Sequence, residues 1–499
     1  MPEQADIIGI HDNSSYAAPI EYILNYVLTI YGVNYKVIPF DQLRREQYNL
    51  DKALVISYGR EYLDTKAGKQ IHIYASDFFG KNYLKPFSMP ATPLKRYDDL
   101  PVIYSGHGEL DNWTTRSQDL FETNIDIIAS SFFMLSRYEE VVQDINDEHG
   151  RFPAIASLAY KEGFLHRPIV NEYIELLWNW IKSLKPELVK NSFWPDKKDF
   201  SVCLTHDIDA LTKYSPLSAI ISTGSAVLRQ GNLRLGFEIA SDYLRTLFHS
   251  QKDPFDIFAY MMDMEQSYGF KSSFYFKAGG SSRYDSGDTV KITSARRLVK
   301  CLVEAGYEIG LHASYNSYDD LNTMVSEKNE LDKIIVNAGY GCRQHYLRWK
   351  TPDTWQIQDE AGLLYDTTMS FADHAGFRCG ICLPFQPFDV KQNKKLDIWE
   401  LPLTIMDRSL RNPNYQNLTP DGGYNMTVKY IETVKRFNGL FVLLWHNSSF
   451  DPLGGWAGWK EVYENVMAYI SEQNALVETG KTIVELWQQN LNSAKSRPD

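Results

Sequence analysis

The chain has 499 residues, of which 44% are hydrophobic and 14% aromatic. This length exceeds one ordinary domain, so two or more domains are expected. The formal net charge of −12 argues against a nucleic-acid-binding surface, which would need a basic stripe, and gives the whole chain no attraction to an anionic membrane.

No targeting segment is evident. Residues 1–6 are acidic and have neither a basic nor an apolar stretch, so no secretory signal is expected. A membrane span is not expected either, because no run of about 18 uncharged apolar residues occurs. The five cysteines are scattered, which is typical of reduced thiols. Together these features predict a cytoplasmic protein.

Residues 1–190 have the pattern of an α/β domain. The predicted helices cover residues 19–31, 124–140 and 169–181, and a buried strand covers residues 53–57. No catalytic group of residues stands out here. The polar segment 185–199 contains two prolines, and we place the domain boundary in it.

After this boundary, strand and helix patterns alternate. The strand at 272–277 is followed by a helix at 294–305, and later strands include 342–349 and 398–401. Such alternation predicts parallel βα units, and about seven of them favour a barrel over an open sheet. Residues 215–250 interrupt the pattern as a partly helical insertion near the predicted mouth.

Two aspartates stand where a predicted strand ends. The apolar run 200–204 leads into Thr205-His206-Asp207-Ile208-Asp209. The i, i+2 spacing can point both carboxylates into the mouth at the carboxyl end of a sheet or barrel. One carboxylate can bind a divalent cation while the other stays free as a general base. Alone, an Asp-x-Asp pair could equally belong to a turn or a cap.

A second strand of the same design, residues 307–311, runs into His312, and Asn316 follows four residues later. If the segment after His312 turns helically, both side chains can ligate a metal from one side. Imidazole suits zinc, iron, cobalt or nickel, whereas Asn is a weaker ligand. A hydrogen-bonded histidine and an Asn that caps a turn are the alternative.

Further candidates lie at two other strands. His446 follows the apolar strand 440–445 and is placed for proton transfer, or else is a satisfied core histidine. Arg343, His345 and Arg348 lie on or at the end of the predicted strand 342–349. Either arginine could keep the catalytic carboxylate ionised, with surface ion pairing as the alternative.

Together, residues 198–485 resemble the polysaccharide deacetylase superfamily, the NodB-like domain of carbohydrate esterase family four. This resemblance implies an α/β fold with a distorted (β/α) barrel of about seven strands, over residues 198–490, preceded by the smaller α/β domain 1–190. The chain is also similar to a subgroup with such an amino-terminal extension, which implies bacterial surface-glycan metabolism.

The resemblance also implies roles for single residues. In the first motif, Asp207 would be the general base and Asp209 a metal ligand. In the second motif, His-x-x-x-His, His312 matches and Asn316 replaces the second histidine as a ligand. The remaining motifs supply an arginine beside the base, which would be Arg348 or Arg343. They also supply the histidine acid, which would be His446, and its carboxylate partner, which would be Asp366 or Asp373.

The implied activity is metal-dependent hydrolysis of a carbon–nitrogen bond. The enzyme would remove N-acetyl groups from an amino-sugar glycan or its precursor, with zinc as the expected metal and cobalt, nickel or iron as alternatives. A lipid-linked or nucleotide-linked precursor would suit a cytoplasmic enzyme better than a cell-surface polymer.

Asn316 keeps rival functions open, because one histidine and one carboxylate bind zinc poorly. The first rival is a non-catalytic glycan-binding protein, in which aromatic side chains stack on sugars, the candidates being Trp349, Trp399, Trp456 and Trp459. The second is a metal-dependent hydrolase of another small amide. A third is an amino-terminal domain that binds a partner or carrier, with the barrel as its scaffold.

Overall fold

The structure is a computed structural model that describes residues 5–13, 15–45, 48, 50, 52–110, 112–335 and 339–495. Residues 1–4, which begin the segment without a secretory pattern, lie outside the described residues. In the part of the chain that is described, every helix is too short or too polar to cross a membrane.

The amino-terminal region contains a six-stranded sheet with the order β2-β1-β3-β4-β8-β7. All neighbouring strands are parallel except β7 and β8. The bounds are β1 Ile7–His11, β2 Tyr35–Pro39, β3 Leu54–Gly59, β4 Lys69–Tyr74, β7 Thr114–Arg116 and β8 Leu120–Thr123.

Three longer helices accompany this sheet: α1 (Ala17–Tyr31), α3 (Ile127–Leu135) and α6 (Ile169–Leu184). The predicted helix 124–140 is divided, because Arg137 adopts a left-handed conformation (φ 50°) between α3 and α4 (Tyr138–Val142). The short elements of this region are α2 Phe40–Arg45, α5 Leu158–Lys161, and the pair β5 Lys95–Tyr97 and β6 Leu100–Val102.

The second sheet is parallel throughout and curls into a half-barrel with the order β16-β13-β12-β11-β10-β9-β18-β17, and β19 also pairs with β9. Its strands are β9 Phe200–Ile208, β10 Ser272–Phe276, β11 Glu308–Ala313, β12 Gly341–Gln344, β13 Tyr365–Asp366, β16 Trp399–Glu400, β17 Ile405–Met406, β18 Leu440–Leu444 and β19 Ala475–Val477.

Helices alternate with these strands, as the sequence pattern predicts. They are α9 Phe258–Ser267, α10 Thr293–Glu304, α11 Leu321–Asp332, α12 Asp353–Glu360, α13 Asp407–Arg411, α14 Pro420–Arg436, α15 Trp459–Ser471 and α16 Gly480–Lys495. A small hairpin, β14 Phe388–Asp389 and β15 Lys394–Lys395, follows β13. The predicted fold class, a distorted barrel after an α/β region, is confirmed.

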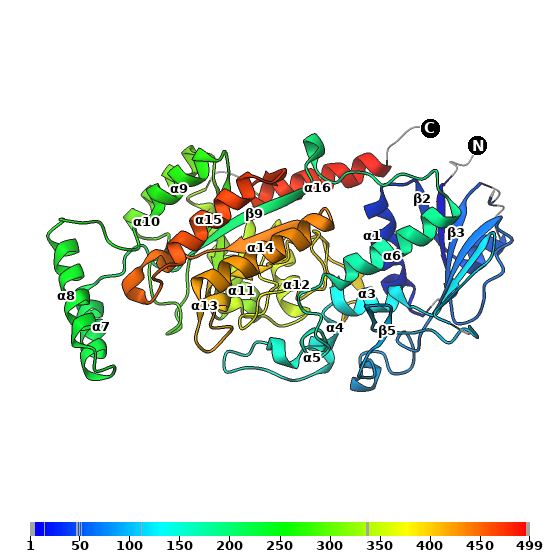
Figure 1. The fold of residues 1–499 in the computed structure, drawn as a ribbon, viewed down its shortest axis with the longest axis horizontal. Coiled ribbons are helices and arrows are strands. Elements are labelled where there is room, and N and C mark those ends of the chain that lie inside the picture. The colour runs from blue at the N-terminus through cyan, green and yellow to red at the C-terminus, as the bar shows by residue number, and fades with distance from the viewer. Residues whose placement is uncertain are drawn as a thin grey trace.

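The predicted insertion 215–250 forms two helices, α7 (Pro216–Leu228) and α8 (Leu233–Leu247). They pack against each other as a hairpin and project from the body at the end opposite the amino-terminal sheet (Figure 1). The hairpin follows β9, the strand that carries Asp207 and is followed directly by Asp209.

One hydrophobic cluster contains buried side chains of both sheets. The rings of Tyr22 on α1 and Phe132 on α3 each lie 5.2 Å from Phe388 on β14, measured between centroids. The division into domains 1–190 and 198–490 therefore stays a prediction, although each region has its own sheet.

A buried ion network also joins the two regions. Arg378, in the segment before β14, donates two hydrogen bonds of 2.9 Å to the carboxylate of Glu140 on α4. Arg137 donates a third to the same carboxylate. Burial alone would raise the pKa of Glu140, but Arg378 and Arg137 outweigh it and lower this pKa to about 2.

We expect Glu140→Gln to lower the free energy of unfolding by about 3–5 kcal/mol, because the buried guanidinium of Arg378 loses its counter-charge and that of Arg137 keeps only Glu139. Since the folded pKa is depressed, the carboxylate contributes its stability above its unfolded pKa of about 4.3. The contribution is lost as the pH falls toward about 2. Urea titrations should therefore show a wild-type advantage at neutral pH that shrinks as the pH falls through this window.

Glu304→Gln is the matched control, because Glu304 is an exposed carboxylate paired with Lys300 on a helix surface. Its expected effect is below about 1 kcal/mol. An equally small effect of Glu140→Gln at neutral pH would refute the structural role of the network.

Candidate metal centre and catalytic cleft

The candidate site lies where parallel strands end together. Asp207 is on β9, and Asp209 directly follows that strand. His312 is on β11, which is separated from β9 by β10. Because β9, β10 and β11 pair in parallel, their carboxyl ends meet at one edge. The sequence prediction that these side chains converge rests on this geometry.

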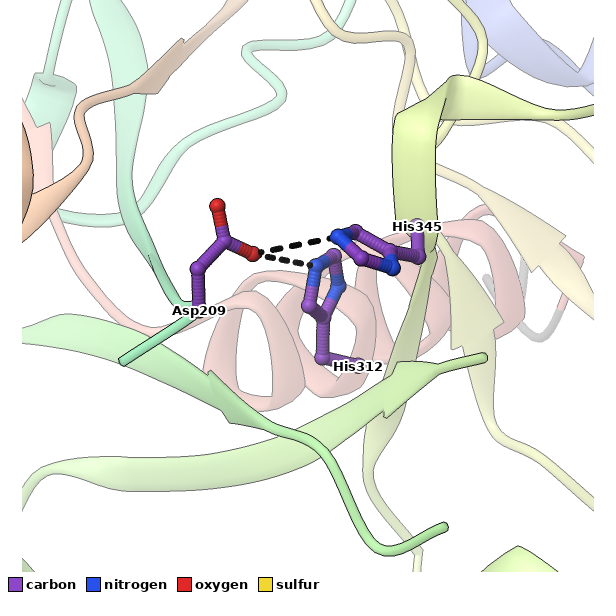
Figure 2. A group of neighbouring side chains, drawn as sticks. All are labelled: Asp209, His312 and His345. Atoms are coloured by element: carbon purple, nitrogen blue, oxygen red, sulfur yellow. Dashed lines mark ion pairs between the residues drawn. The ribbon is translucent and has the colours of Figure 1, made fainter. Parts of the chain in front are cut away.

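Asp209, His312 and His345 form a compact cluster, shown in Figure 2. Asp209 Oδ1 lies 3.3 Å from a ring nitrogen, Nε2, of His312 and 3.4 Å from Nε2 of His345. One candidate ligand atom from each residue lies within 4.8 Å of the others. A carboxylate and two imidazoles at this spacing are a donor set typical of zinc and related divalent cations.

The other ring nitrogen of each histidine fixes which nitrogen faces the cluster. His312 Nδ1 donates to the carbonyl oxygen of Arg343, and His345 Nδ1 donates to Asp285 Oδ1, both at 3.0 Å. In the neutral state each Nε2 then presents a lone pair instead of a hydrogen. Three electron pairs converge with no hydrogen between them, so the cluster fits a cation.

Burial and pKa directions agree with this reading. Asp209 Oδ1 and His312 Nε2 are buried and have no hydrogen-bond partner among the described residues. Burial would raise the pKa of Asp209, but the two histidines and Arg408 hold it well below its usual range. Burial would lower the pKa of His345, but the carboxylates of Asp209 and Asp285 raise it. Without a metal, a proton on His345 Nε2 can lie between this nitrogen and Asp209 Oδ1.

The predicted strand 342–349 is wrong in its second half, and the turn found there brings His345 to the cluster. Strand β12 ends at Gln344, and the next residues form a tight turn in which Tyr346 and Leu347 are left-handed, with φ of 64° and 51°. The turn directs His345 toward the end of β9. The sequence marked His345 as a strand-end residue but not as a ligand.

Asp285 holds His345 in place from the loop after β10. Its carboxylate also accepts hydrogen bonds from the backbone N–H groups of Ser282 and Tyr315 and from the Ser282 hydroxyl. Burial would raise the pKa of Asp285, but His345 and these donors lower it well below its usual value. The carboxylate is therefore ionised at neutral pH and well suited to orient a metal ligand.

We expect Asp285→Asn to weaken zinc affinity by about 10- to 100-fold, the usual effect of losing a carboxylate that orients a ligating histidine. Competition with a chromogenic chelator measures this affinity. Asp320→Asn, which removes an exposed carboxylate from a nearby loop, should leave it unchanged. Equal zinc affinity in wild type and Asp285→Asn would contradict the orienting role.

Asn316, the predicted ligand, does not join this cluster. It is exposed, and its side-chain oxygen accepts a hydrogen bond of 3.2 Å from Arg348. The segment after His312 does not continue as an α-helix, so the i, i+4 spacing does not bring the two side chains together. His345, which directly follows the next strand, β12, supplies the third donor of the cluster instead.

Neither predicted arginine contacts Asp207 among the described residues. Arg348 donates to the carbonyls of His149 and Tyr315 and stacks on the Tyr315 ring, with 4.0 Å to the ring centre. Arg343 is fully buried and donates to the hydroxyl of Thr205, two residues before Asp207. The predicted role of holding Asp207 ionised is not supported for Arg348, and for Arg343 it stays a prediction.

Asp207 itself is buried, and its Oδ1 has no hydrogen-bond partner in the described part of the chain. Its other oxygen, Oδ2, lies 3.9 Å from Nδ1 of His312. An unpartnered carboxylate oxygen beside a cation-type cluster can accept a proton from a water molecule bound there. The role of Asp207 as a general base stays a prediction that this position allows.

His446 follows β18, as predicted, but its carboxylate partner is Asp407. Nδ1 of His446 donates to Asp407 Oδ1 at 2.8 Å, and the backbone N–H of His446 donates to Oδ2 at 2.7 Å. The predicted partners lie elsewhere, since Asp366 bonds Gln358 and Thr368 and Asp373 bonds the Ala154 N–H. The strand before Asp407, β17, has two residues, too few to give a sequence signal.

These residues line one cleft of about 310 Å³. Its walls include Asp207, Asp209, His312, His345 and His446. Arg408, which the sequence reasoning missed, also lines the cleft and donates to Asp209 Oδ2 at 3.2 Å. Of the four tryptophans considered for sugar stacking, Trp349, Trp399 and Trp459 are buried and none lines this cleft. The aromatic lining comes from Tyr346 and Tyr415 instead.

Similarity to known proteins covers part of the chain in some cases and nearly all of it in one. Residues 8–186 match the model of a family of unknown function, DUF7033. A search of curated proteins finds no match. Among solved structures, a protein from Mycobacterium smegmatis assigned as a polysaccharide deacetylase matches with 16% identity and a TM-score of 0.40, covering 61% of this chain and 96% of that one.

Two further structures match at lower identity. Agd3, described as a carbohydrate deacetylase, has 8% identity and a TM-score of 0.36, with 98% of this chain and 87% of that chain covered. BA3943, a CE4-family pseudoenzyme from Bacillus anthracis, has 11% identity and a TM-score of 0.30, with 58% and 66% covered. The descriptions of these three structures name two deacetylases and one pseudoenzyme.

Proposed function

We propose that this protein is a metal-dependent amidohydrolase that removes N-acetyl groups from an amino-sugar-containing glycan or glycan precursor. One observation carries the proposal. The three converging electron pairs of Asp209, His312 and His345 lie in the same cleft as the free carboxylate oxygen of Asp207 and as His446. The rival reading, a non-catalytic binder, rested on the weak ligand Asn316, and His345 removes that reason.

Asp209, His312 and His345 would hold the metal, with zinc the best fit to one carboxylate and two imidazoles. When bound, a divalent cation polarises the amide carbonyl and lowers the pKa of water. The chain's own groups then manage the protons. Asp207 Oδ1 accepts a proton from the attacking water, whose oxygen bonds to the carbonyl carbon.

His446 completes the reaction. Its Nδ1 is held by Asp407, so Nε2 is the nitrogen available to the cleft. Burial would raise the pKa of Asp407, but His446 lowers it, so the carboxylate stays ionised and accepts the hydrogen bond from His446 Nδ1. Nε2 donates its proton to the departing nitrogen as the carbon–nitrogen bond breaks. Water and amide thus give a carboxylic acid and an amine.

Acetate release from short oligomers of N-acetylglucosamine tests the proposal. We expect release by zinc-loaded protein, loss of release after chelation, and recovery when zinc is returned. Other N-acyl amides of similar size serve as the comparison for substrate class. A folded, zinc-loaded protein that releases no acyl group from any of them would refute the proposed activity.

A further inference from the structure

The α7–α8 hairpin carries an unusual concentration of exposed apolar side chains. Nine of the 20 large hydrophobic side chains that are exposed among the described residues lie between residues 217 and 248. Leu228, Phe237 and Phe248 are 85%, 76% and 76% exposed. The others are Leu217, Ile220, Ile221, Leu233, Leu244 and Leu247. Isolated exposed hydrophobic residues are ordinary, but a concentrated patch marks an interaction surface.

These side chains fall on one stripe of each helix. On α8 they recur at residues 233, 237, 244 and 248, and on α7 at residues 217, 221 and 228. Spacings of four, seven and eleven residues place side chains on the same helical face. Each helix therefore presents an apolar face that the described residues of the chain leave exposed.

The inner face of the hairpin is built from smaller groups. The buried residues of α7 are Ala219 and Ala226, and those of α8 are Gly236, Ile239 and Asp242. A side chain at Gly236 would come within 2.5 Å of Val227 Cγ2, so the helices pack closely there. The small residues face inward and most large ones face outward, the reverse of a hairpin whose stability in water comes from its own core.

The hairpin also differs from the rest of the chain in charge. The hairpin, residues 216–247, contains three basic residues and two acidic ones, a net charge of +1, whereas the whole chain has −12. A second copy docked on the hairpin would bring two positive surfaces together. Anionic lipid headgroups have the complementary charge, and an apolar helix face beside arginines is typical of helices that lie in a membrane interface.

The base of the hairpin is tied to the candidate cleft. Lys213, four residues after Asp209, pairs with Asp451 at 2.8 Å, in the loop that follows His446. The carboxylate of Asp253 accepts hydrogen bonds from the backbone N–H groups of Lys213 and Tyr214. The hairpin thus leaves the molecule from the edge of the sheet that holds the site.

We propose that the α7–α8 hairpin docks this protein on the surface of an anionic lipid bilayer. The large apolar side chains enter the boundary between headgroups and acyl chains, and Arg229 and Arg234 near the tip contact phosphate groups. Docking on a surface differs from spanning, and it needs no long apolar helix. The net charge of the whole chain does not predict this, because the arginines and exposed apolar side chains that would contact lipid lie in one projecting element.

Sedimentation with vesicles tests this inference on the full-length protein. The vesicles are phosphatidylcholine alone and an equimolar mixture of phosphatidylcholine and phosphatidylglycerol. Wild type should bind the mixed vesicles, and added salt should weaken binding because it screens the headgroup charge. Leu228→Ser/Leu233→Ser/Phe237→Ser should bind at least about tenfold more weakly, since three large apolar side chains are lost from the interface.

Two variants serve as comparisons. Phe87→Ser/Ile155→Ser/Val189→Ser removes three exposed apolar side chains outside the hairpin and should bind like wild type. Arg229→Gln/Arg234→Gln should lose affinity only for the mixed vesicles. Circular dichroism confirms that each variant is folded.

Three results would overturn the proposal. Wild type could fail to bind either vesicle, or the hairpin triple variant could bind as well as wild type. Sedimentation velocity could instead show a wild-type dimer that the same triple variant dissociates, with no vesicle binding, which would assign the apolar faces to a second copy. None of these results depends on acetate release, so this inference and the proposed activity are tested separately.

Discussion

Replacing Asp207 with Asn is expected to lower turnover by about 10²- to 10⁴-fold, the range typical of losing a general base. The amide has nearly the same shape as the carboxylate but cannot accept the proton of the attacking water. The buried Oδ1 has no hydrogen-bond partner to lose in the described structure, so the fold should be kept. Acetate release by zinc-loaded variant and wild type measures the effect.

Asp421→Asn is the control for this experiment, because Asp421 is an exposed aspartate in the first turn of α14 and should not affect turnover. The metal content of both variants should match wild type. Near-normal turnover by a metal-loaded Asp207→Asn protein would exclude Asp207 as the base.

His446→Gln is the second change with a large expected effect, again about 10²- to 10⁴-fold in turnover, because the leaving nitrogen loses its proton donor. The loss should depend on the substrate. An activated anilide, whose leaving amine needs little protonation, should lose much less than an N-acetylated sugar. Comparing the two substrates separates loss of an acid from general damage to the site.

Asp407→Asn is the companion variant, since Asp407 acts through His446 and touches no substrate atom. It should show the same difference between the two substrates, with a smaller loss. Equal losses for anilide and sugar in both variants would show that His446 does not act as the acid.

The sequence predicted those parts of the site that directly continue long apolar strands. Asp207 and His312 lie near the carboxyl ends of β9 and β11, and Asp209 and His446 follow β9 and β18. The buried runs of these three strands are five residues or longer. Parallel pairing then brings their ends together without any further information. The same pattern predicted the barrel region and the α/β region before it.

The missed residues depend on local turns and on contacts distant in sequence. His345 enters the cluster because Tyr346 and Leu347 adopt left-handed conformations, and neither is a residue type that predicts such a turn. Asp407 follows a strand of two residues, and Asp285 lies in a loop whose path no periodicity describes. Asn316 was favoured by its sequence spacing alone, which the structure does not turn into proximity.

Metal content measured by elemental analysis tests whether Asp209, His312 and His345 bind a metal ion. Wild type, His345→Ala and Asn316→Ala would be purified without chelator, reconstituted with zinc and freed of excess metal. We expect about one zinc per chain in wild type and in Asn316→Ala. In folded His345→Ala we expect the zinc to be lost. Retention of zinc by His345→Ala, loss by Asn316→Ala, or no zinc in reconstituted wild type would contradict it.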